Sequence, residues 1–538
     1  MKLSRQEIKA EEKWLESGVE LPKFDYEKTA ENTHNRPTWI HFGAGNIFRA
    51  FQANLQQRLL DEGLTDTGLI VAEGYDYEIV TKMNAPHDNL SLLVTLKASG
   101  KVDKKVIASV TESYALDSHN VSDFGRVKEI FASPSLQMVS FTITEKGYSL
   151  VNGKGEYLES VKYDAENGVN EPDSYIGKVV ALLYHRFKSG SLPIAMVSMD
   201  NCSHNGDKLK QAVMGMTKLW LDGGFVEQEF IDYLNDENKV TFPWSMIDKI
   251  TPRPDATVMQ MLEECGVEGM EPIITSKNTY IAPYVNAEEC EYLVIEDAFP
   301  NGRPPLDKAG VYFTDRETVD KVEKMKVCTC LNPLHTALAI YGCVLGYTKI
   351  SEEFKDEDLV KLAKNIGYIE GMPVVVDPGI ISPKDFLAAV VNERIPNPFM
   401  PDTPQRIATD TSQKLPIRFG ETIKKYMESQ ELEVTDLRFI PLVFAGWLRY
   451  LMAIDDNGNS FELSSDPLLD ELLPIIKNIT FGEGVSDRAA IEKILSNGNI
   501  FGVNLFEAGL AEKVIEYFGE LNAGCGSVRT TLKKYLNI

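Results

Sequence analysis

The segment 38–73 constrains the fold more than any other part of the chain, because its sequence predicts a strand, a glycine turn, a helix and a second strand in succession. The β-rich run "TWIHF" leads into "GAGN", and helical periodicity follows over 47–63. The apolar residues there recur at spacings of three, four and four: Phe48, Phe51, Leu55 and Leu59. They therefore share one face of a helix. The run "GLIVAE" (68–73) predicts the second strand, so the segment predicts a βαβ unit.

Three further apolar runs extend this pattern through the first half of the chain. These are "KVIASVTESYAL" (105–116), "MVSFTITE" (138–145) and "PIAMVSMD" (193–200). Each predicts a strand that ends in polar residues, which is typical of the ligand-binding edge of a parallel α/β sheet. The alternating residues between 75 and 120 indicate an antiparallel insertion. We therefore expect a Rossmann-type, doubly wound α/β domain with insertions.

The second half of the chain predicts an all-helical domain. A connector rich in proline and glycine, "FPNGRPP", precedes it, and helical patterns follow one another beyond residue 331. We expect an N-terminal extension at 1–36, a nucleotide-binding domain at 37–302 and a helical substrate domain at 303–538. The fold class is thus α/β followed by all-α.

Composition limits the classes of partner. The net charge of −25 over 538 residues argues against nucleic acid or an anionic membrane surface, since both require a basic face. The seven cysteines, an odd number, are scattered along the chain and do not suggest a disulfide framework. The polar N-terminus has no signal-peptide pattern, and no apolar run is long enough to span a membrane. These observations favour a cytoplasmic enzyme with a small-molecule substrate, either a monomer or a small homo-oligomer.

The glycine turn is a candidate dinucleotide site. Gly43 permits the tight strand-to-helix turn, and Gly45 lets a pyrophosphate approach the backbone at the start of the helix. The third glycine of the usual fingerprint is absent, and an ordinary tight turn is the alternative. Glu73, at the end of the next strand, is suited to accept hydrogen bonds from a ribose diol, with Asp76 as a second candidate. No Arg or Lys occurs in "EGYDYE", which favours NAD over NADP.

The stretch 326–336, "KVCTCLNPLHT", brings together several reactive residue types. A zinc site would need Cys328, Cys330 and His335 together with Cys202 and His204. However, the C-x-C spacing is not that of a zinc knuckle. The alternation over 327–331 predicts instead a half-buried strand with core cysteines, so we predict no metal.

The same stretch is suited to proton chemistry. Asn332 and Pro333 predict the start of a helix, with His335 one turn in and Lys326 upstream. A lysine withdrawn from water beside other cations can act as a base, and asparagine amides can donate to an alkoxide without adding charge. The ordinary alternative is a capping asparagine, a core histidine and a solvated lysine.

Seven motifs resemble, in order, those of the mannitol dehydrogenase family of long-chain, polyol-specific dehydrogenases. They are "HFGAGNIFRAF", "FTITEKGYS", "VSMDN", "MIDKITPRP", "EYLVIEDAFPNGRPPL", "KVCTCLNPLHTAL" and "DTPQRIATDTSQKLPIR". The resemblance runs from about residue 38 to the C-terminus. It implies a Rossmann-type domain, a helical domain, an active site between them, and metal-independent hydride transfer with NAD.

The resemblance also implies roles for individual residues. Lys326 is similar to the family's general base, Asn201 and Asn332 to its oxyanion-hole amides, and His335 to the histidine that orients substrate and base. Arg406 and Lys414 are similar to the family's substrate-binding cations, and Glu323 is similar to an acid near the lysine that assists proton exit. The predicted cofactor-binding residues are Gly43, Gly45, Asn46, Phe48, Arg49, Glu73, Thr142 and Asp248.

One spacing departs from the family pattern. The family usually has four residues between the lysine and the asparagine, whereas five separate Lys326 from Asn332 and the usual lysine position holds Val327. The retained spacing of Glu323 to Lys326 favours a one-residue bulge that re-aims the lysine.

The predicted substrate is a keto-uronate. Arg406, Lys414 and Arg418 would suit a uronate carboxylate, and "NPLHTAL" and "PNGRPPL" resemble the branch that interconverts D-fructuronate and D-mannonate. The alternatives are mannitol and fructose, then tagaturonate, and last a non-catalytic NAD-binding sensor in which the shifted lysine is a lesion.

Overall fold

The structure is a computed structural model that describes residues 1–536. The chain divides into two compact units. The first unit comprises residues 1–96 and 101–320, and the second comprises residues 97–100 and the chain from 321 onward. We call the second the helical unit. The division falls inside one helix, α11 (Arg316–Met325).

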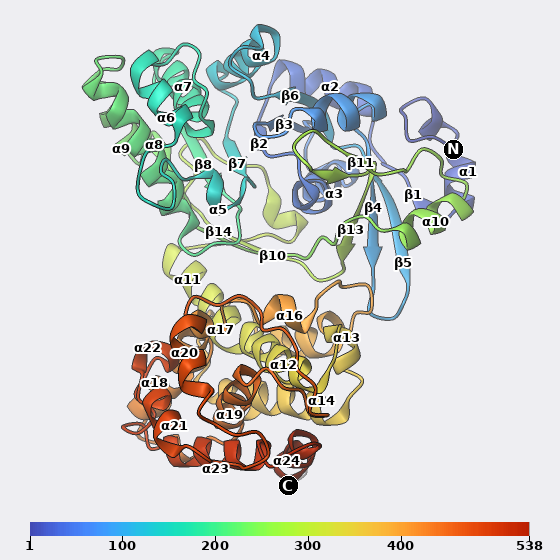
Figure 1. Cartoon of the computed structure of the whole chain (residues 1–538). Helices are drawn as coiled ribbons and strands as arrows, with labels where there is room; N and C mark the ends of the chain where they lie inside the picture. Colours follow the sequence, from blue (N-terminus) through green and yellow to red (C-terminus); the bar gives the residue numbers. More distant parts are fainter. Residues whose placement is uncertain (537–538) are drawn as a thin grey trace. The chain divides into compact units, whose positions relative to one another are not determined.

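The first unit is built on a six-stranded parallel sheet, labelled in Figure 1. Its strands are β2 (Trp39–Phe42), β3 (Leu69–Glu73), β6 (Val110–Ala115), β7 (Met138–Phe141), β8 (Ile194–Ser198) and β9 (Val240–Thr241). They lie in the order β6-β3-β2-β7-β8-β9, and every neighbouring pair is parallel. In chain order this is 3-2-1-4-5-6, the strand order of the Rossmann dinucleotide-binding fold. The predicted βαβ unit and fold class are confirmed.

Helices cover both faces of this sheet. Side chains of a strand alternate between the two faces, so Ile40 and Phe42 pack with one layer of helices and Trp39 packs with the other. The four apolar residues that defined the helical face in the sequence lie together in the second layer. The helices of the unit are α1 (Glu11–Glu16), α2 (Tyr26–Asn35), α3 (Ala53–Asp61), α4 (Val121–Ala132), α5 (Thr144–Gly147), α6 (Glu159–Asn167), α7 (Tyr175–Lys188), α8 (Asn205–Asp222), α9 (Gln228–Asn235) and α10 (Ala256–Glu264).

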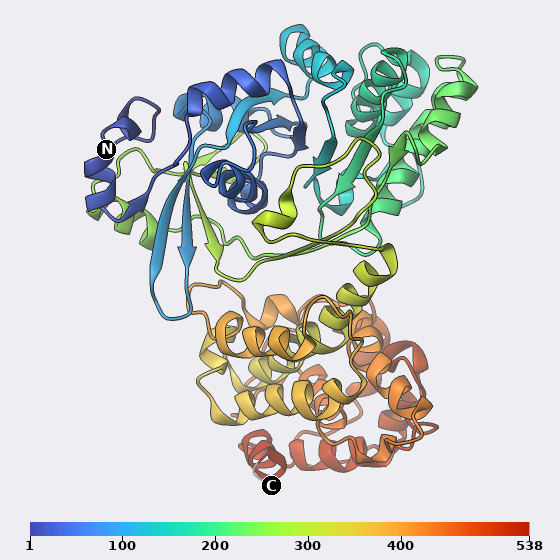
Figure 2. The same ribbon diagram turned by 180° about the vertical axis from the view of Figure 1, so that it is seen from behind.

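A second sheet contains the predicted antiparallel insertion. The strands β4 (Ser91–Leu96) and β5 (Val102–Ile107) form an antiparallel hairpin, and β13 (Tyr284–Glu288) pairs in parallel with β4. The N-terminal extension adds β1 (Val19–Glu20) to the other edge of the hairpin, as Figures 1 and 2 show. The extension is therefore part of the folded unit, with Trp14 fully buried.

Two small sheets complete the first unit. One contains β10 (Ser245–Asp248), β14 (Tyr292–Glu296) and β15 (Tyr312–Thr314), and the other contains β11 (Ile273–Ile274) and β12 (Tyr280–Ile281).

The helical unit contains helices and one isolated β-bridge in the part that the structure describes. Figure 2 shows its helices from yellow to red. Its α-helices after α11 are α12 (Asn332–Leu345), α13 (Ile350–Glu353), α14 (Glu357–Lys364), α15 (Pro383–Ala389), α16 (Pro404–Ile407), α17 (Thr411–Leu415), α18 (Glu421–Glu428), α19 (Phe439–Leu451), α20 (Leu469–Ile476), α21 (Arg488–Leu495), α22 (Gly498–Phe501), α23 (Ala511–Leu521) and α24 (Ser527–Leu536).

The half-buried strand predicted over 327–331 is wrong. These residues form a π-helical turn, η6 (Lys326–Cys330), that joins α11 to α12. The backbone N–H of Leu331 donates to the carbonyl of Lys326 at 3.1 Å, which is the i→i+5 bond of a π turn. Alternation over so few residues does not separate a strand from a buried helix, and here the flanking helices decide the conformation. Asn332 is the first residue of α12, with Pro333 next, so the predicted helix start is confirmed.

The run from α11 through α12, residues 316–345, is long and apolar enough to cross a membrane by length and composition alone. However, 78% of its most apolar window is buried inside the protein. Burial of this kind is typical of a core helix in a globular domain.

A buried carboxyl in the helical unit gives a testable pH dependence of stability. Glu353, in α13, is 0% exposed, and neither carboxyl oxygen has a hydrogen-bond partner among the described residues. Burial, and then the nearby Asp356, raise the pKa of Glu353 from 4.5 to about 9. The folded state therefore binds a proton between these two pH values that the unfolded state has released.

We expect wild-type stability to fall as pH rises from about 5 to 9, by up to about 1.4 kcal/mol per pH unit, because the folded state holds the extra proton in this window. Glu353→Gln keeps the neutral shape and removes this slope. Urea denaturation at several pH values measures the difference between the two proteins. Glu352→Gln, at the exposed neighbour, is the matched control. Parallel curves for wild type and Glu353→Gln would show that Glu353 is charged in the folded protein.

Candidate functional site

The turn after β2 requires glycine at its first position. Gly43 has φ of 107°, and a Cβ there would lie 2.3 Å from the carbonyl oxygen of Thr142. Thr142 follows β7, the strand on the other side of β2. The chain order of the strands reverses between β2 and β7, and open α/β sheets bind ligands at such switch points. Gly43 and the predicted residue Thr142 therefore lie together at this point.

The second glycine leaves open space above the turn. Apart from its two chain neighbours, no described residue has an atom within 4 Å of the Cβ position of Gly45, so a ligand can approach the backbone there. Asn46, the next residue, accepts a 2.8 Å hydrogen bond from Nη2 of Arg49. The turn thus has the free approach that a pyrophosphate needs at the start of a helix.

Phe48 and Arg49 lie beneath the turn, inside the protein. Arg49 is 5% exposed and donates to the carbonyl oxygen of Ala282 at 2.7 Å, and burial lowers its pKa to about 10. Phe48 stacks on the ring of His41, with ring centroids 4.5 Å apart. Burial lowers the pKa of His41 to about 3, so the imidazole is neutral. These contacts make Phe48 and Arg49 supports of the turn.

The two acids proposed for the ribose are buried and already hydrogen-bonded. Glu73 is 5% exposed and accepts from three backbone N–H groups, those of Ala44, Tyr75 and Asp76, at 2.7–3.0 Å. The carboxylate of Asp76 accepts from the hydroxyl of Thr275 and the N–H of Glu78. A carboxylate has about four acceptor positions, so Glu73 has one left for a ligand.

A cavity of about 370 Å³ lies at the carboxyl ends of the central strands and contains the predicted residues Asn201 and Asp248. Its other lining residues are Ile47, Thr144, Glu145, Met199, Asp200, Lys249, Ile250, Thr251 and Ile247. They follow β2, β7 and β8, or lie at and after the end of β10, and Ile47 brings the cavity next to the glycine turn. Its position and size fit the nicotinamide end of a dinucleotide.

Asp200 organises this cavity and was not among the predicted site residues. Its carboxylate accepts from the N–H groups of Ile143 and Thr144 and, at 2.5 Å, from the hydroxyl of Tyr148. It thereby holds Thr144 in a left-handed conformation with φ of 64°. Burial raises the pKa of Asp200, and the hydrogen bonds oppose this shift. The sequence signal that could have identified Asp200 was its position next to Asn201 in the motif "VSMDN".

In the helical unit, the predicted proton-transfer residues lie on three consecutive segments: α11, the π turn and α12. Glu323 is in α11, Lys326 begins the π turn and is 5% exposed, and Asn332 and His335 lie one turn apart in α12. Asn332 and His335 are partly exposed, whereas most of their neighbours are buried. The two side chains therefore share the polar face at the start of α12.

The three candidate substrate-binding cations differ in their surroundings. Arg418 donates to the hydroxyl of Thr336, next to His335, at 2.5 Å, and burial lowers its pKa to about 10. The ammonium of Lys414 donates to the carbonyl oxygens of Ile407 and Thr409. Burial, then Arg418, lower the pKa of Lys414. The side chain of Arg406 is 67% exposed and pairs with Asp402. Arg418 is thus the cation in closest contact with the Asn332–His335 segment.

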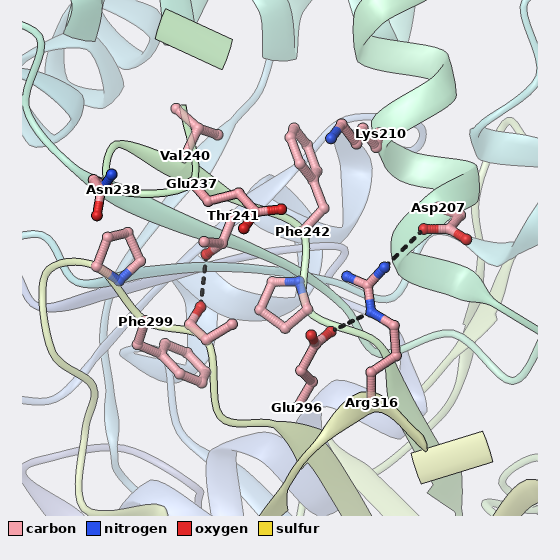
Figure 3. Close-up of a pocket in the computed structure, with 13 residues that line it drawn as sticks. Asp207, Lys210, Glu237, Asn238, Val240, Thr241, Phe242, Glu296, Phe299 and Arg316 are labelled. Atoms are coloured by element: carbon pink, nitrogen blue, oxygen red, sulfur yellow. Dashed lines mark hydrogen bonds and ion pairs between the residues drawn. The ribbon is translucent and has the colours of Figure 1, made fainter. Parts of the chain in front are cut away.

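A larger cavity, of about 530 Å³, contains none of the predicted residues (Figure 3). It is lined by residues of α8, β9 and the start of α11. Its arginine, Arg316, is bound by Glu296 at 3.0 Å and Asp207 at 3.6 Å. The hydroxyl of Thr241 donates to the carbonyl of Ala298. The charge of this arginine is therefore paired with two carboxylates of the same cavity.

No cluster of three or more His, Cys, Asp or Glu side chains suitable for a metal ion occurs within residues 1–536.

The strand order, the glycine turn and the cavity at the switch point define a dinucleotide-binding dehydrogenase domain. The "Mannitol dehydrogenase Rossmann domain" matches residues 37–308, and the "Mannitol dehydrogenase C-terminal domain" matches residues 318–521. The chain belongs to the mannitol dehydrogenase family.

Relatives extend this result over the whole chain. A D-mannonate oxidoreductase of Thermotoga maritima is 53% identical over 536 residues, with 99% of each chain covered. A solved D-sorbitol dehydrogenase, substrate-free, has a TM-score of 0.78 and 25% identity, and covers 96% of this chain and 97% of its own. Pseudomonas fluorescens mannitol 2-dehydrogenase, in ternary complex with NAD and D-mannitol, has a TM-score of 0.68 and 26% identity over 100% of both chains.

Proposed function

We propose that this protein is an NAD-dependent D-mannonate oxidoreductase that interconverts D-fructuronate and D-mannonate. The observation that carries the proposal is the 53% identity, over 99% of both chains, to the D-mannonate oxidoreductase of T. maritima. The mannitol and sorbitol dehydrogenases that share the fold are about half as similar, at 25–26% identity.

The first unit is suited to hold NAD. Gly43 and Gly45 leave the backbone of the turn open to the pyrophosphate, and the cavity beside Asn201 and Asp248 takes the nicotinamide. Asp200 keeps the loop after β7 in place at this cavity. When bound, the cofactor supplies the hydride-transfer chemistry, and the protein supplies binding and orientation.

The assigned roles follow the direction of oxidation. Lys326 accepts the proton of the secondary alcohol, and the amides of Asn201 and Asn332 donate hydrogen bonds to the developing alkoxide. His335, one turn beyond Asn332, orients the substrate against the base. Glu323, one turn before Lys326, passes the proton toward solvent. In reduction each group acts in reverse.

The carboxylate of a sugar acid distinguishes this substrate from a neutral polyol. A guanidinium binds a carboxylate through two parallel N–H bonds, which selects for both charge and geometry. Arg418, half-buried and hydrogen-bonded to Thr336, is the cation that we assign to this role. Lys414 and Arg406 add further positive charge.

The expected result of a substrate panel is rapid NADH oxidation with D-fructuronate, and turnover at least about 100-fold slower with fructose, because fructose lacks the carboxylate. Tagaturonate, which keeps the carboxylate but differs in stereochemistry, is the third substrate. Initial rates at matched concentrations give kcat/KM for each. Faster turnover of fructose would place the protein among the polyol dehydrogenases. NADH binding without turnover of any of the three would favour the sensor.

Cellular location and assembly are part of the proposal. No disulfide joins any of the seven cysteines within residues 1–536, which suits a reducing cytoplasm. We propose a monomer or small homo-oligomer acting on a small molecule.

A further inference from the structure

A loop distant in sequence is attached to the segment after β3, where the adenosine ribose of a Rossmann cofactor binds. The hydroxyl of Thr275 donates to Asp76 at 2.5 Å, and the N–H of Ser276 donates to Glu78 at 3.2 Å. Thr275 and Asp76 are both buried, so the connection is firm. The β11–β12 loop is therefore fixed beside the end of β3, in the same unit.

This loop brings a cation to a position that the local sequence lacks. The ammonium of Lys277 lies over the ring of Tyr75, 5.4 Å from its centroid. Tyr75 is 64% exposed, and Lys277 is exposed as well. Lys277 makes no ion pair with any residue that the structure describes, so its charge is available to a ligand.

The acids around Lys277 are bound to other groups. Glu73 accepts three backbone N–H groups, and Asp76 is held by Thr275 and the N–H of Glu78. Glu78 pairs with Lys82 at 2.7 Å. An acid that excludes NADPH does so by presenting its carboxylate to the 2′ position, and Glu73 has one acceptor position left. Three of the roughly four acceptor positions of Glu73 are thus taken by backbone N–H groups, and the ammonium of Lys277 lies over the ring of Tyr75, two residues further on.

NAD and NADP differ only at the 2′ oxygen of this ribose, where NADP carries a phosphate. We propose that Lys277 pairs with this 2′-phosphate, with its ammonium held over the ring of Tyr75, so that the enzyme accepts NADP(H) as well as NAD(H). Charge-assisted bonds to phosphate are among the strong hydrogen bonds in proteins. The inference rests on the proposed function, because it concerns the cofactor of that reaction.

Direct binding tests the inference without turnover. We expect Lys277→Ala to weaken NADPH about tenfold and NADH less than about twofold, because one charge-assisted contact is lost from NADPH alone. Fluorescence titration of each reduced cofactor gives the two dissociation constants. Adenosine 2′,5′-bisphosphate, compared with AMP by calorimetry, should show the same difference. Lys277→Arg should keep NADPH affinity close to that of wild type.

Lys218→Ala is the charge-matched control, since it removes an exposed lysine of the same unit without touching Tyr75 or the acids near it. Loss of NADPH affinity in Lys218→Ala equal to that in Lys277→Ala would overturn the inference, because general electrostatics would then explain both. Unchanged NADPH affinity in Lys277→Ala, or no NADPH binding by the wild type, would overturn it as well. Either result can coincide with NADH binding and fructuronate turnover, which leaves the proposed function intact. A wild type that binds neither cofactor overturns both.

Discussion

Lys326→Ala should lower kcat by about 10³-fold or more, while NADH affinity stays unchanged. General acid–base catalysis by a positioned side chain contributes about 10²–10⁴-fold, and alanine provides no replacement. Lys326 is 5% exposed at the start of the π turn, so bulk water has poor access to the position it would leave. Single-turnover rates with D-fructuronate, together with a separate NADH titration, measure the two effects independently.

A small primary amine provides a further check. Methylamine should restore part of the activity of Lys326→Ala, because it can enter the space left by the side chain and carry the proton. Lys324→Ala removes an exposed lysine from the same helix and should behave as wild type. Equal losses in Lys324→Ala and Lys326→Ala, or an active Lys326→Ala, would show that another group is the base.

Arg186→Leu should lower the free energy of unfolding by about 5 kcal/mol or more. Arg186 is fully buried and donates to five backbone carbonyls, those of Phe131, Ser133, Leu136, Leu192 and Pro193. These carbonyls precede β7 and β8, so one side chain fixes the entry of both strands into the sheet. Each buried polar group left unpaired costs about 1–3 kcal/mol. Burial lowers the pKa of Arg186 to about 10, and it remains charged at neutral pH.

Arg186→Lys separates charge from geometry. An ammonium keeps the charge but has three donors, which cannot reach five carbonyls, so this variant should fall between wild type and Arg186→Leu. Denaturant midpoints rank the three proteins. Lys188→Leu, at an exposed position two residues on, should change stability little. Equal stability of Arg186→Lys and wild type would mean that the charge alone matters.

The sequence was sufficient to predict the elements with strong local patterns. The periodicity of Phe48 to Leu59 and the short apolar runs predicted the βαβ unit, and both are confirmed because burial on two faces of the sheet produces these patterns directly. Asn332 and Pro333 predicted the start of α12, since proline at the first turn of a helix costs no hydrogen bond. The motifs predicted the family, which the matched domains confirm.

Features set by tertiary contacts could not be predicted. Arg49 follows the glycine turn in sequence, yet its guanidinium binds the carbonyl of Ala282, more than two hundred residues away. Lys277 reaches Tyr75 over a similar distance in sequence, so inspection of "EGYDYE" alone missed this cation. The strand predicted at 327–331 failed because both flanking segments are helices, and their continuity overrides a short alternation.

The π turn also explains how this chain accommodates one residue more than the family's usual spacing. An extra residue in a regular α-helix rotates everything after it by about 100°, which would turn the apolar face of α12 out of the core. The wider turn at Lys326–Cys330 absorbs the addition before α12 begins, and Leu334, Leu338 and Tyr341 remain fully buried. A comparison by fixed spacing would place Val327 at the lysine position of the family pattern that the motif resembles. Comparison of this segment across homologues should therefore allow a gap inside the helix, where alignments normally forbid one.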